Sequence, residues 1–307
     1  MKAVRYDRYG DSSALVYGDA DRPVPGAGQV LIEVAATSFN PVDAAIRAGY
    51  LADVFPLDFP HVPGIDVAGS IAQLGDGVSN WQVGASVVGF LPMNADGAAA
   101  EYVIAPADVL AAAPDTVPLA DAAVLPAVGL TAWQSLFEHA GLKAGQTILI
   151  NGAGGAVGGY AVQLAKQTDA VVTATAGARS ADRVKAYGAD RIIGHLDYEA
   201  LAVDGAPFDV VLNLVNTTPD ETAALVELVK DGGVLVSTTT PAPENRRVRT
   251  VRVFARSDAE QLGGLVHRVD AGQLRIDVAD RRPLTELAAV HADADAGRLA
   301  GKTILVP

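Results

Sequence analysis

A glycine-rich turn between an expected strand and an expected helix is the feature that most constrains this chain. Residues Thr147–Asn151 (TILIN) form a short aliphatic and β-branched run, which predicts a buried strand. The turn Gly152–Gly158 (GAGGAVG) follows, and apolar residues then recur at helical spacing up to Lys166. Such a strand, turn and helix place a helix N-terminus, with its free N–H groups and positive dipole end, where a pyrophosphate can bind.

The spacing of the glycines departs from the usual dinucleotide motif G-x-G-x-x-G. Gly152 and Gly154 match its first two glycines, but the sixth position is Val157 and the next glycine is Gly158. A glycine turn can also serve structure alone, yet the flanking strand and helix are the context that nucleotide binding requires. The residues expected to contact the cofactor phosphates are Gly152, Gly154, Gly155, Ala156 and Val157.

Composition narrows the classes of protein and partner. The chain has 307 residues, enough for two domains, and it has no Cys, which excludes disulfides, thiolate metal sites and cysteine nucleophiles. Its formal net charge of −13 disfavours nucleic acid and anionic membranes as partners. Lys2, Arg5 and Asp7 interrupt the first residues in a strand-like alternation rather than preceding an apolar leader. A cytoplasmic protein with a small-molecule substrate is expected.

The pattern of expected secondary structure differs between two parts of the chain. Up to about residue 110, short strands separated by Gly/Pro turns predict a small, irregular β-barrel. Those strands are expected at Met1–Tyr6, Gln29–Thr37, Gly64–Leu74, Ala85–Phe90 and Ala99–Ala105, with a short helix at Asp43–Ala48. Residues Leu119–Leu142 are Ala-rich with helical periodicity, broken by Pro126 and Gly129.

From Thr147 the pattern alternates between strand and helix, which predicts a parallel sheet wound with helices on both faces. The strands are expected at Thr147–Asn151, Val171–Ala176, Arg191–Gly194, Phe208–Val215 and Val234–Thr239, and the helices at Gly158–Gln167, Ala181–Gly188 and Pro219–Val229. Two further helices, Ala259–Ala271 and Leu284–Gly297, and a last strand, Lys302–Val306, follow. We expect the last strand to return to the first domain.

Six short motifs occur in an order that resembles one known family. They are Asn40-Pro41-x-Asp43 followed by Arg47 and Gly49-Tyr50, Pro63-Gly64-x-Asp66-x-x-Gly69, Leu125-Pro126-x-x-Gly129-Leu130-Thr131-Ala132, the glycine turn, Tyr187-Gly188-Ala189-Asp190, and Gly301-Lys302. The chain resembles, nearly from end to end, the zinc-independent quinone oxidoreductases of the medium-chain dehydrogenase/reductase superfamily. Their glycine turn has the same longer spacing.

The resemblance implies an α/β protein with two domains. A GroES-like β-barrel domain would comprise residues 1–118 and 253–307, and a Rossmann doubly wound parallel sheet, residues 119–252, would bind NADPH. Zinc-dependent members carry a Cys near Ser38–Asn40 and a His-Glu pair where this chain has Ile65-Asp66, so no metal site is expected. His61 alone cannot hold zinc, and a turn or pocket-rim position is the simpler interpretation.

The residues after the second strand of the nucleotide domain point to NADPH. A site for NAD usually places Asp or Glu there to hold the ribose 2′-OH. Here Thr175 is followed by no acid, and Arg179 arrives where a 2′-phosphate would sit. Arg183 is a second candidate or else part of a solvated helix face. His195 lies where the family often has an aromatic near the adenosine, or else in a surface loop.

Strand ends and one helix complete the expected cofactor cleft. Carboxyl ends of parallel strands are where ligands bind in such sheets, so Val215, Asn216 and Thr239 are expected on the nicotinamide side. Thr131 resembles the family's Thr that touches the same side of the cleft.

Asn40 and Tyr50 are the candidate catalytic residues. The resemblance places Asn40 at the nicotinamide ribose or the substrate carbonyl. Tyr50 could polarise a carbonyl or protonate the product, or it could form a hydrophobic wall of the pocket. Asp43 and Arg47 lie four residues apart on one short helix and are expected to pair with each other rather than to act in catalysis.

The leading hypothesis is an NADPH-dependent reductase of a quinone. An enone or enoyl (double-bond) reductase of the same family is the alternative, because the pocket would be built from variable loops. A binding protein of another class, which holds NADPH as a sensor or structural module without turnover, also remains open. A homodimer through the alternating edge segment Arg247–Phe254 is expected, although a charged edge strand also keeps monomers apart.

Overall fold

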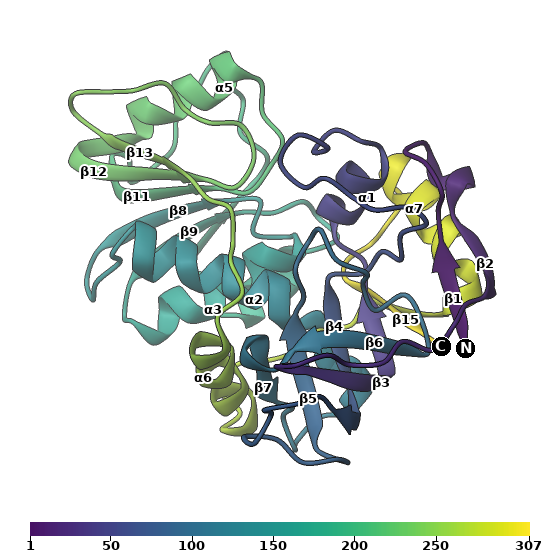
Figure 1. Cartoon of the computed structure of the whole chain (residues 1–307). Helices are drawn as coiled ribbons and strands as arrows, with labels where there is room; N and C mark the ends of the chain where they lie inside the picture. The colour runs from purple at the N-terminus through teal and green to yellow at the C-terminus, as the bar shows by residue number, and fades with distance from the viewer. The chain divides into compact units, whose positions relative to one another are not determined.

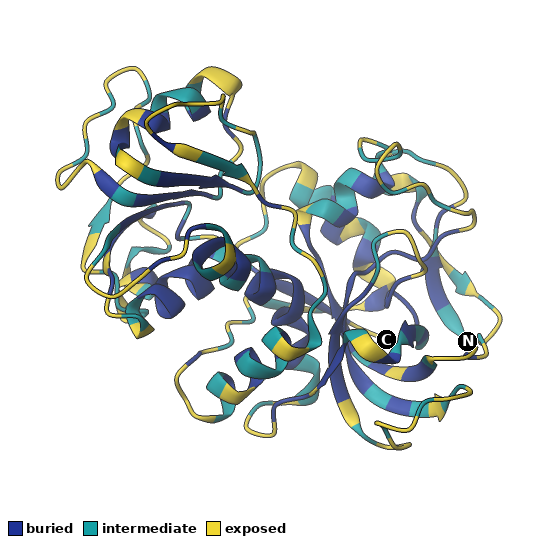
Figure 2. Cartoon of the chain, turned by 60° about the vertical axis from the view of Figure 1, so that its left-hand side comes forward, coloured by how far each residue is buried: buried dark blue, intermediate teal, exposed yellow.

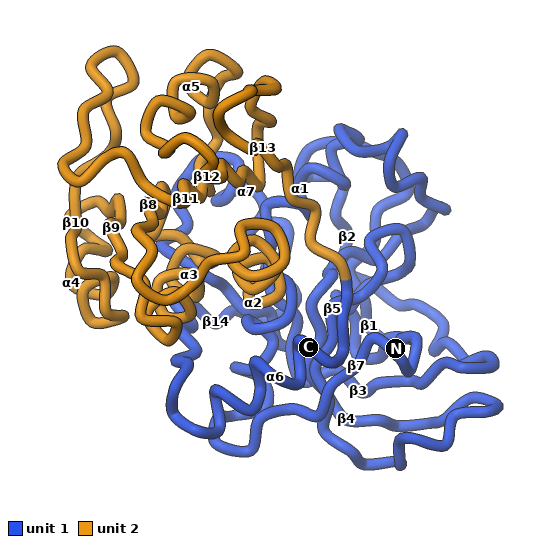
Figure 3. Tube along the Cα trace, turned by 90° about the vertical axis from the view of Figure 1, so that its left-hand side faces the viewer, with its two compact units in different colours: residues 1–127, 257–307 blue, residues 128–256 orange.

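The computed structural model describes residues 1–307, and the chain divides into two compact units (Figure 3). Unit 1 comprises Met1–Ala127 and Ser257–Pro307, and unit 2 comprises Val128–Arg256. The short helix η3 (Leu119–Val124) belongs to unit 1, because it packs on strands β3 (Gln29–Ser38) and β4 (Asp66–Leu74). Domain boundaries after residues 118 and 252 stay a prediction.

Unit 2 is built on a six-stranded parallel sheet in the order β10-β9-β8-β11-β12-β13. The strands are β8 (Thr147–Asn151), β9 (Val171–Thr175), β10 (Arg191–Ile193), β11 (Phe208–Asn213), β12 (Val229–Ser237) and β13 (Arg249–Arg252). The chain winds outward from β8 through β9 to β10 and then crosses to β11, so the order reverses beside β8. This confirms the doubly wound sheet, and ligands bind at such a reversal point.

Helices cover both faces of that sheet. In Figure 1, α5 (Pro219–Ala224) lies on one face and α3 (Ala156–Gln167) on the other, and α4 (Ala181–Ala186) follows β9. The helix expected at Pro219–Val229 is shorter than predicted. It ends in a 3-10 turn at Leu225–Leu228, because Val229 already pairs with Phe208 as the first residue of β12.

Unit 1 contains the curled sheet of the barrel, in the order β14-β15-β3-β4-β5-β7, with β6 paired to β3 and a separate pair β1-β2. The remaining strands are β1 (Lys2–Arg5), β2 (Val16–Asp19), β5 (Ser86–Phe90), β6 (Tyr102–Pro106), β7 (Leu110–Ala112), β14 (Asp280–Pro283) and β15 (Thr303–Val306). The last strand does return to the first unit, since Ile304 pairs with Ser38 of β3. Figure 2 shows the interior strands buried.

Three helices complete unit 1. Helix α1 (Pro41–Arg47) follows β3, and α6 (Ala259–Asp270) and α7 (Leu287–Asp295) belong to the tail. Gly64 has φ +105, and a Cβ there would lie 2.9 Å from Thr37 Oγ1 and 3.0 Å from the Ala99 nitrogen. Only glycine fits this turn, which delivers Asp66 to the start of β4. No helix in the structure combines the length and apolarity needed to cross a membrane.

Candidate functional site

The glycine turn of unit 2 has the geometry of a phosphate cradle. Gly152 follows β8 with φ +98, and a Cβ on Gly158 would lie 2.4 Å from the Gly152 carbonyl oxygen. The turn therefore packs directly on the first turn of α3, whose N-cap is the exposed Gly155. The first N–H groups of α3, at Ala156 and Val157, have no partner within the helix. Donors, helix dipole and an open approach together fit a pyrophosphate.

A network of neutral polar side chains fixes the sheet beneath this turn. The Thr175 hydroxyl donates to Asn151 Oδ1 over 3.0 Å and accepts the Gly152 N–H over 2.8 Å. Asn151 Nδ2 donates to Asn213 Oδ1 over 2.9 Å and to the Tyr198 hydroxyl over 3.0 Å. The buried Thr175 hydroxyl is thus engaged with the turn. Direct contact of Thr175 with the cofactor stays a prediction.

The network continues to the ends of β11 and β12. Asn213 Nδ2 donates to Thr217 Oγ1 over 3.1 Å, and the Thr239 hydroxyl donates to the Val215 carbonyl oxygen over 2.8 Å. Asn216 is exposed. The structure therefore brings Val215 and Thr239 together at the carboxyl edge of the sheet. Their contacts with a nicotinamide stay a prediction.

The sequence predicts three basic side chains, Arg179, Arg183 and His195, near the adenosine end of the cofactor. Arg179 is exposed and has no hydrogen bond or ion pair within the chain. Arg183 donates from Nη2 to the Gly154 carbonyl oxygen over 2.9 Å, so it braces the turn instead of lying on a solvated helix face. The exposed His195 has its Nε2 3.3 Å from where a Cβ on Gly177 would stand. Arg179 and His195 thus flank the segment after β9, where the adenosine end is expected.

Thr131 lies on α2 (Pro126–Trp133) and is half-buried. It is already engaged in an interaction within the chain. Its place beside a nicotinamide stays a prediction.

Unit 1 contains a buried ionic cluster that composition alone does not reveal. Lys302 Nζ donates to the Phe39 carbonyl oxygen over 2.9 Å, to Asn40 Oδ1 over 2.5 Å and to Asp66 Oδ2 over 3.2 Å. These three bonds use all three donors of the ammonium group. Burial lowers the pKa of Lys302, and the Asp66 carboxylate opposes that shift.

The Asp66 carboxylate is the centre of this cluster. It is 0% exposed, and its Oδ2 also accepts from the Ser38 hydroxyl over 2.5 Å and from Asn40 Nδ2 over 2.8 Å. Its Oδ1 accepts the Ala127 N–H near the start of α2 over 2.7 Å. A buried carboxylate with this many donors is well compensated.

Asn40 and Tyr50, the candidate catalytic residues, differ in setting. The Asn40 side chain is 4% exposed and engaged at both ends, to Lys302 and to Asp66. To contact a ribose or a substrate, the Asn40 amide would have to give up its hydrogen bond to Lys302 or to Asp66. Tyr50 is 84% exposed. Both catalytic roles stay predictions.

The expected pairing of Asp43 with Arg47 is wrong. Asp43 Oδ2 accepts the Asn40 N–H over 2.9 Å, because a carboxylate at the third helical position closes a capping box. Arg47 reaches the tail helix instead, with Nη2 3.0 Å from Asp295 Oδ2 and Nη1 3.1 Å from His291 Nδ1.

Burial shifts the pKa values of two of these groups. It raises the pKa of Asp43 to about 7, and the Asp66 carboxylate adds to that shift. Burial and the Arg47 cation lower the pKa of His291 to about 3. Asp43 is therefore the buried carboxyl of unit 1 that can hold a proton near neutral pH.

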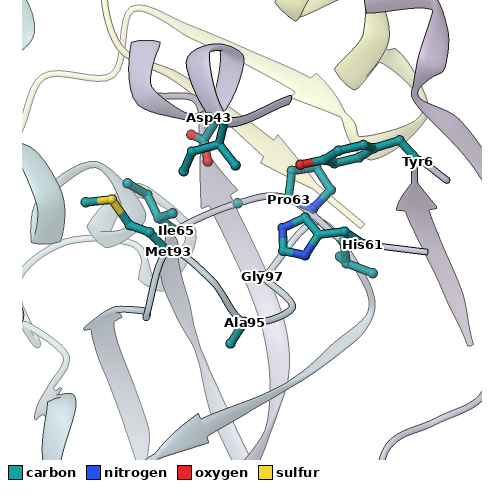
Figure 4. Close-up of a pocket in the computed structure, with 11 residues that line it drawn as sticks. Tyr6, Asp43, His61, Pro63, Ile65, Met93, Ala95 and Gly97 are labelled. Carbon is teal, nitrogen blue, oxygen red and sulfur yellow. The ribbon is translucent and has the colours of Figure 1, made fainter. Parts of the chain in front are cut away.

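No group of three or more His, Cys, Asp or Glu side chains is arranged to hold a metal ion. The positions at which zinc-dependent relatives of the predicted family carry ligands do meet in space, at Ser38, Asn40 and Asp66. A Lys302 ammonium group lies among them. His61 is buried, pairs with Tyr6 through backbone hydrogen bonds and lines a small cavity (Figure 4).

The sequence analysis does not identify several residues of the neutral polar network in unit 2 and of the ionic cluster in unit 1. Asn151 and Asn213 are the last residues of β8 and β11, and a polar side chain ending an apolar strand could have marked them. Lys302 was part of a motif, but only the fold shows that this residue, which immediately precedes β15, lies beside Phe39 and Asn40 at the end of β3. His291 and Tyr198 gave no signal of their partners.

Two protein families match parts of the chain. The family described as "Alcohol dehydrogenase GroES-like domain" matches residues 26–115, and the one described as "Zinc-binding dehydrogenase" matches residues 187–305. A chloroplast envelope quinone oxidoreductase homolog of Arabidopsis thaliana is 33% identical over 100% of this chain and 98% of its own length. A 2-methylene-furan-3-one reductase of Solanum lycopersicum is 33% identical over 100% of this chain and 79% of its own length.

A solved structure agrees in fold. The structure of mycobacterial Rv1454c complexed with NADPH superposes with a TM-score of 0.87 at 27% identity, over 100% of both chains. The 33% identity to the Arabidopsis relative along the whole chain, together with the two units described above, establishes the assignment that the six sequence motifs predicted. The chain belongs to the quinone oxidoreductase family of the medium-chain dehydrogenase/reductase superfamily.

Proposed function

We propose that the protein is an NADPH-dependent reductase that transfers hydride to a quinone. The observation that carries the proposal is the glycine turn on α3, with Gly152, Gly155 and Gly158 in a geometry that admits a pyrophosphate. The bound cofactor would supply the hydride. The chain would hold the phosphates at the N-terminus of α3 and orient the cofactor at the carboxyl edge of the sheet.

NADPH is preferred over NADH in this proposal because of Arg179. No Asp or Glu stands in residues 176–180, directly after β9, and the Arg179 guanidinium is exposed and unpaired. A guanidinium makes charge-assisted bonds to a phosphate that a ribose hydroxyl cannot match. His195, beside Gly177, would contact the same end of the cofactor.

The substrate class is tested by following NADPH absorbance with a benzoquinone and, in parallel, with an open-chain enone. We expect a higher kcat/KM for the quinone. The tomato relative's name supports enone reduction as the second candidate, and a reversed preference would establish it. Binding of NADPH without turnover on either class would leave a cofactor-binding protein and contradict the proposal.

We also propose a homodimer and a cytoplasmic location. β13 is an edge strand that pairs only with β12, and Arg249 and Arg252 are exposed on it. Light scattering on the purified protein, which would give twice the mass of one chain, tests the dimer. The Arabidopsis relative is named as a chloroplast envelope protein, so location is best tested directly by fractionation.

A further inference from the structure

The first half of the glycine turn is held by the segment that follows β9. The Gly152 N–H donates to the Thr175 hydroxyl over 2.8 Å, and the Ala153 N–H donates to the Thr175 carbonyl oxygen over 3.1 Å. At Gly154, a Cβ would lie 2.3 Å from Ser180 Oγ, so the Ser180 side chain packs directly on that glycine. The turn therefore depends for its position on this segment as well as on its own glycines.

Arg183, on the short helix α4, supplies a further contact to the turn. Its Nη2 donates to the Gly154 carbonyl oxygen over 2.9 Å. The Gly155 N–H belongs to the same trans peptide, so it points the other way, and it donates to the Gly152 carbonyl oxygen over 3.1 Å. Two carbonyl oxygens of the turn are thus bound to donors within the chain. A carbonyl oxygen turned outward would repel a phosphate, so these two bonds preserve a site for an anion.

Arg179 lies within a second tight turn of the same segment. The Gly177 carbonyl oxygen accepts the Ser180 N–H and the Ala181 N–H, both over 3.0 Å, and the Ser180 hydroxyl over 3.2 Å. Arg179 stands between these residues and is exposed. The guanidinium expected at a 2′-phosphate is therefore carried by the immediate neighbour of Ser180, the residue that packs on the glycine turn.

We infer that Arg183 is a positioning residue for the cofactor, which fixes the glycine turn against the turn that carries Arg179. The inference rests on the proposed function. Arg183 acts through the Gly154 carbonyl, whereas Arg179 acts on the 2′-phosphate itself. Without the Arg183 bond the glycine turn is held less firmly. Every ligand with a pyrophosphate should then bind more weakly, with or without a 2′-phosphate.

The test is calorimetric titration of the whole protein with NADP⁺ and with ADP-ribose, which has a pyrophosphate but no 2′-phosphate. Arg183→Ala should weaken the binding of both ligands about tenfold, the effect of losing one hydrogen bond from a charged group. Arg179→Ala should weaken the binding of NADP⁺ alone. Lys185→Ala is the matched control and should change neither affinity, because it removes an exposed cation from the same helix.

A second readout needs no ligand. Amide hydrogen exchange at Gly155 should be faster in Arg183→Ala than in the wild type or in Lys185→Ala, and unchanged in the strands of the sheet, because only the turn is loosened. Arg183→Lys keeps a charged donor and should recover part of the slow exchange and of the ADP-ribose affinity. In steady-state assays with a quinone, the loss in Arg183→Ala should fall on the KM for NADPH far more than on kcat.

The outcomes separate the inference from the proposed function. An ADP-ribose affinity that is unchanged in Arg183→Ala overturns the inference, and so does unchanged exchange at Gly155. A loss confined to NADP⁺ also overturns it, because Arg183 would then contact the 2′-phosphate directly. In these cases quinone reduction by the wild type leaves the proposed function standing. A wild type that binds both ligands but reduces no quinone contradicts the proposed function alone, and one that binds neither contradicts both.

Discussion

The buried polar groups of the two units differ in kind. In unit 1 they are ionic and titratable, with Lys302 and Asp66 at one place and Arg47 beside His291 at another. In unit 2 they are amides and hydroxyls, centred on Asn151 and Asn213. This contrast between ionic and neutral groups indicates which unit uses buried charges. A neutral network holds the phosphate cradle without competing for the anion, whereas unit 1 buries charged groups that compensate one another, as Lys302 and Asp66 do.

The largest effect is expected from Lys302→Met. The substitution leaves the Asp66 carboxylate buried, at 0% exposure, without its counter-ion. Loss of one partner of a buried ion pair costs about 3–5 kcal/mol. Urea denaturation measures the free energy of unfolding. Lys2→Met, which removes an exposed pair with Asp19, is the control and should change it little. Similar losses in the two variants would contradict an ionic core in unit 1.

The next effect is on acid stability and comes from His291. Its pKa is lowered from 6.5 to about 3 in the folded protein, so protonation favours the unfolded chain. The contribution of neutral His291 to stability is therefore complete above pH 6.5 and is lost as the pH falls from 6.5 towards 3. His291→Gln keeps an acceptor for Arg47 and should flatten the dependence of Tm on pH between 6.5 and 4. A slope equal to that of the wild type would contradict burial of a neutral imidazole.

Unit 2 should respond to Asn151→Ala in a different manner. The change removes hydrogen bonds to Thr175, Asn213 and Tyr198. Unsatisfied buried polar groups cost about 1–3 kcal/mol. Because these partners are neutral amides and hydroxyls, the loss should be equal at pH 5.5 and pH 8. Denaturation at the two pH values measures it, and a marked difference between them would show that the network is coupled to a charge.

The smallest effect is expected from Arg179→Ala, and it falls on binding rather than stability. Loss of one exposed phosphate contact should weaken NADPH binding about tenfold, which is roughly 1.4 kcal/mol, and leave NADH unchanged. Cofactor fluorescence titration gives both dissociation constants. Arg191→Ala is the control, because Arg191 is also exposed but lies at the amino end of β10. Equal NADPH affinity in wild type and Arg179→Ala would leave the cofactor preference without its proposed cause.

The sequence predicts the bounds of the strands and helices of unit 2 more accurately than it predicts which side chains interact. The strand Thr147–Asn151 was predicted with its observed bounds, since an apolar run that ends at a glycine turn has few alternatives. The helix predicted from Gly158 begins at Ala156, because the glycines at its start give no periodic signal.

The sequence does not predict contacts between side chains that are far apart in the chain. Arg47 was expected to pair with the nearby Asp43, but it contacts His291 and Asp295, 244 and 248 residues away. Lys302 likewise reaches Asp66 across 236 residues. Spacing along one helix says nothing of such pairs, because they depend on how β15 and α7 return to the barrel.

The central claim is that this chain reduces a quinone with NADPH and without a metal ion. The most direct measurement is the rate of NADPH oxidation by a benzoquinone after exhaustive dialysis against a strong chelator, with hydroquinone quantified in the same sample. We predict one hydroquinone per NADPH, at a rate equal to that of the undialysed protein and well above that with NADH. No hydroquinone, or a rate that is lost on dialysis and restored by zinc, would contradict the account.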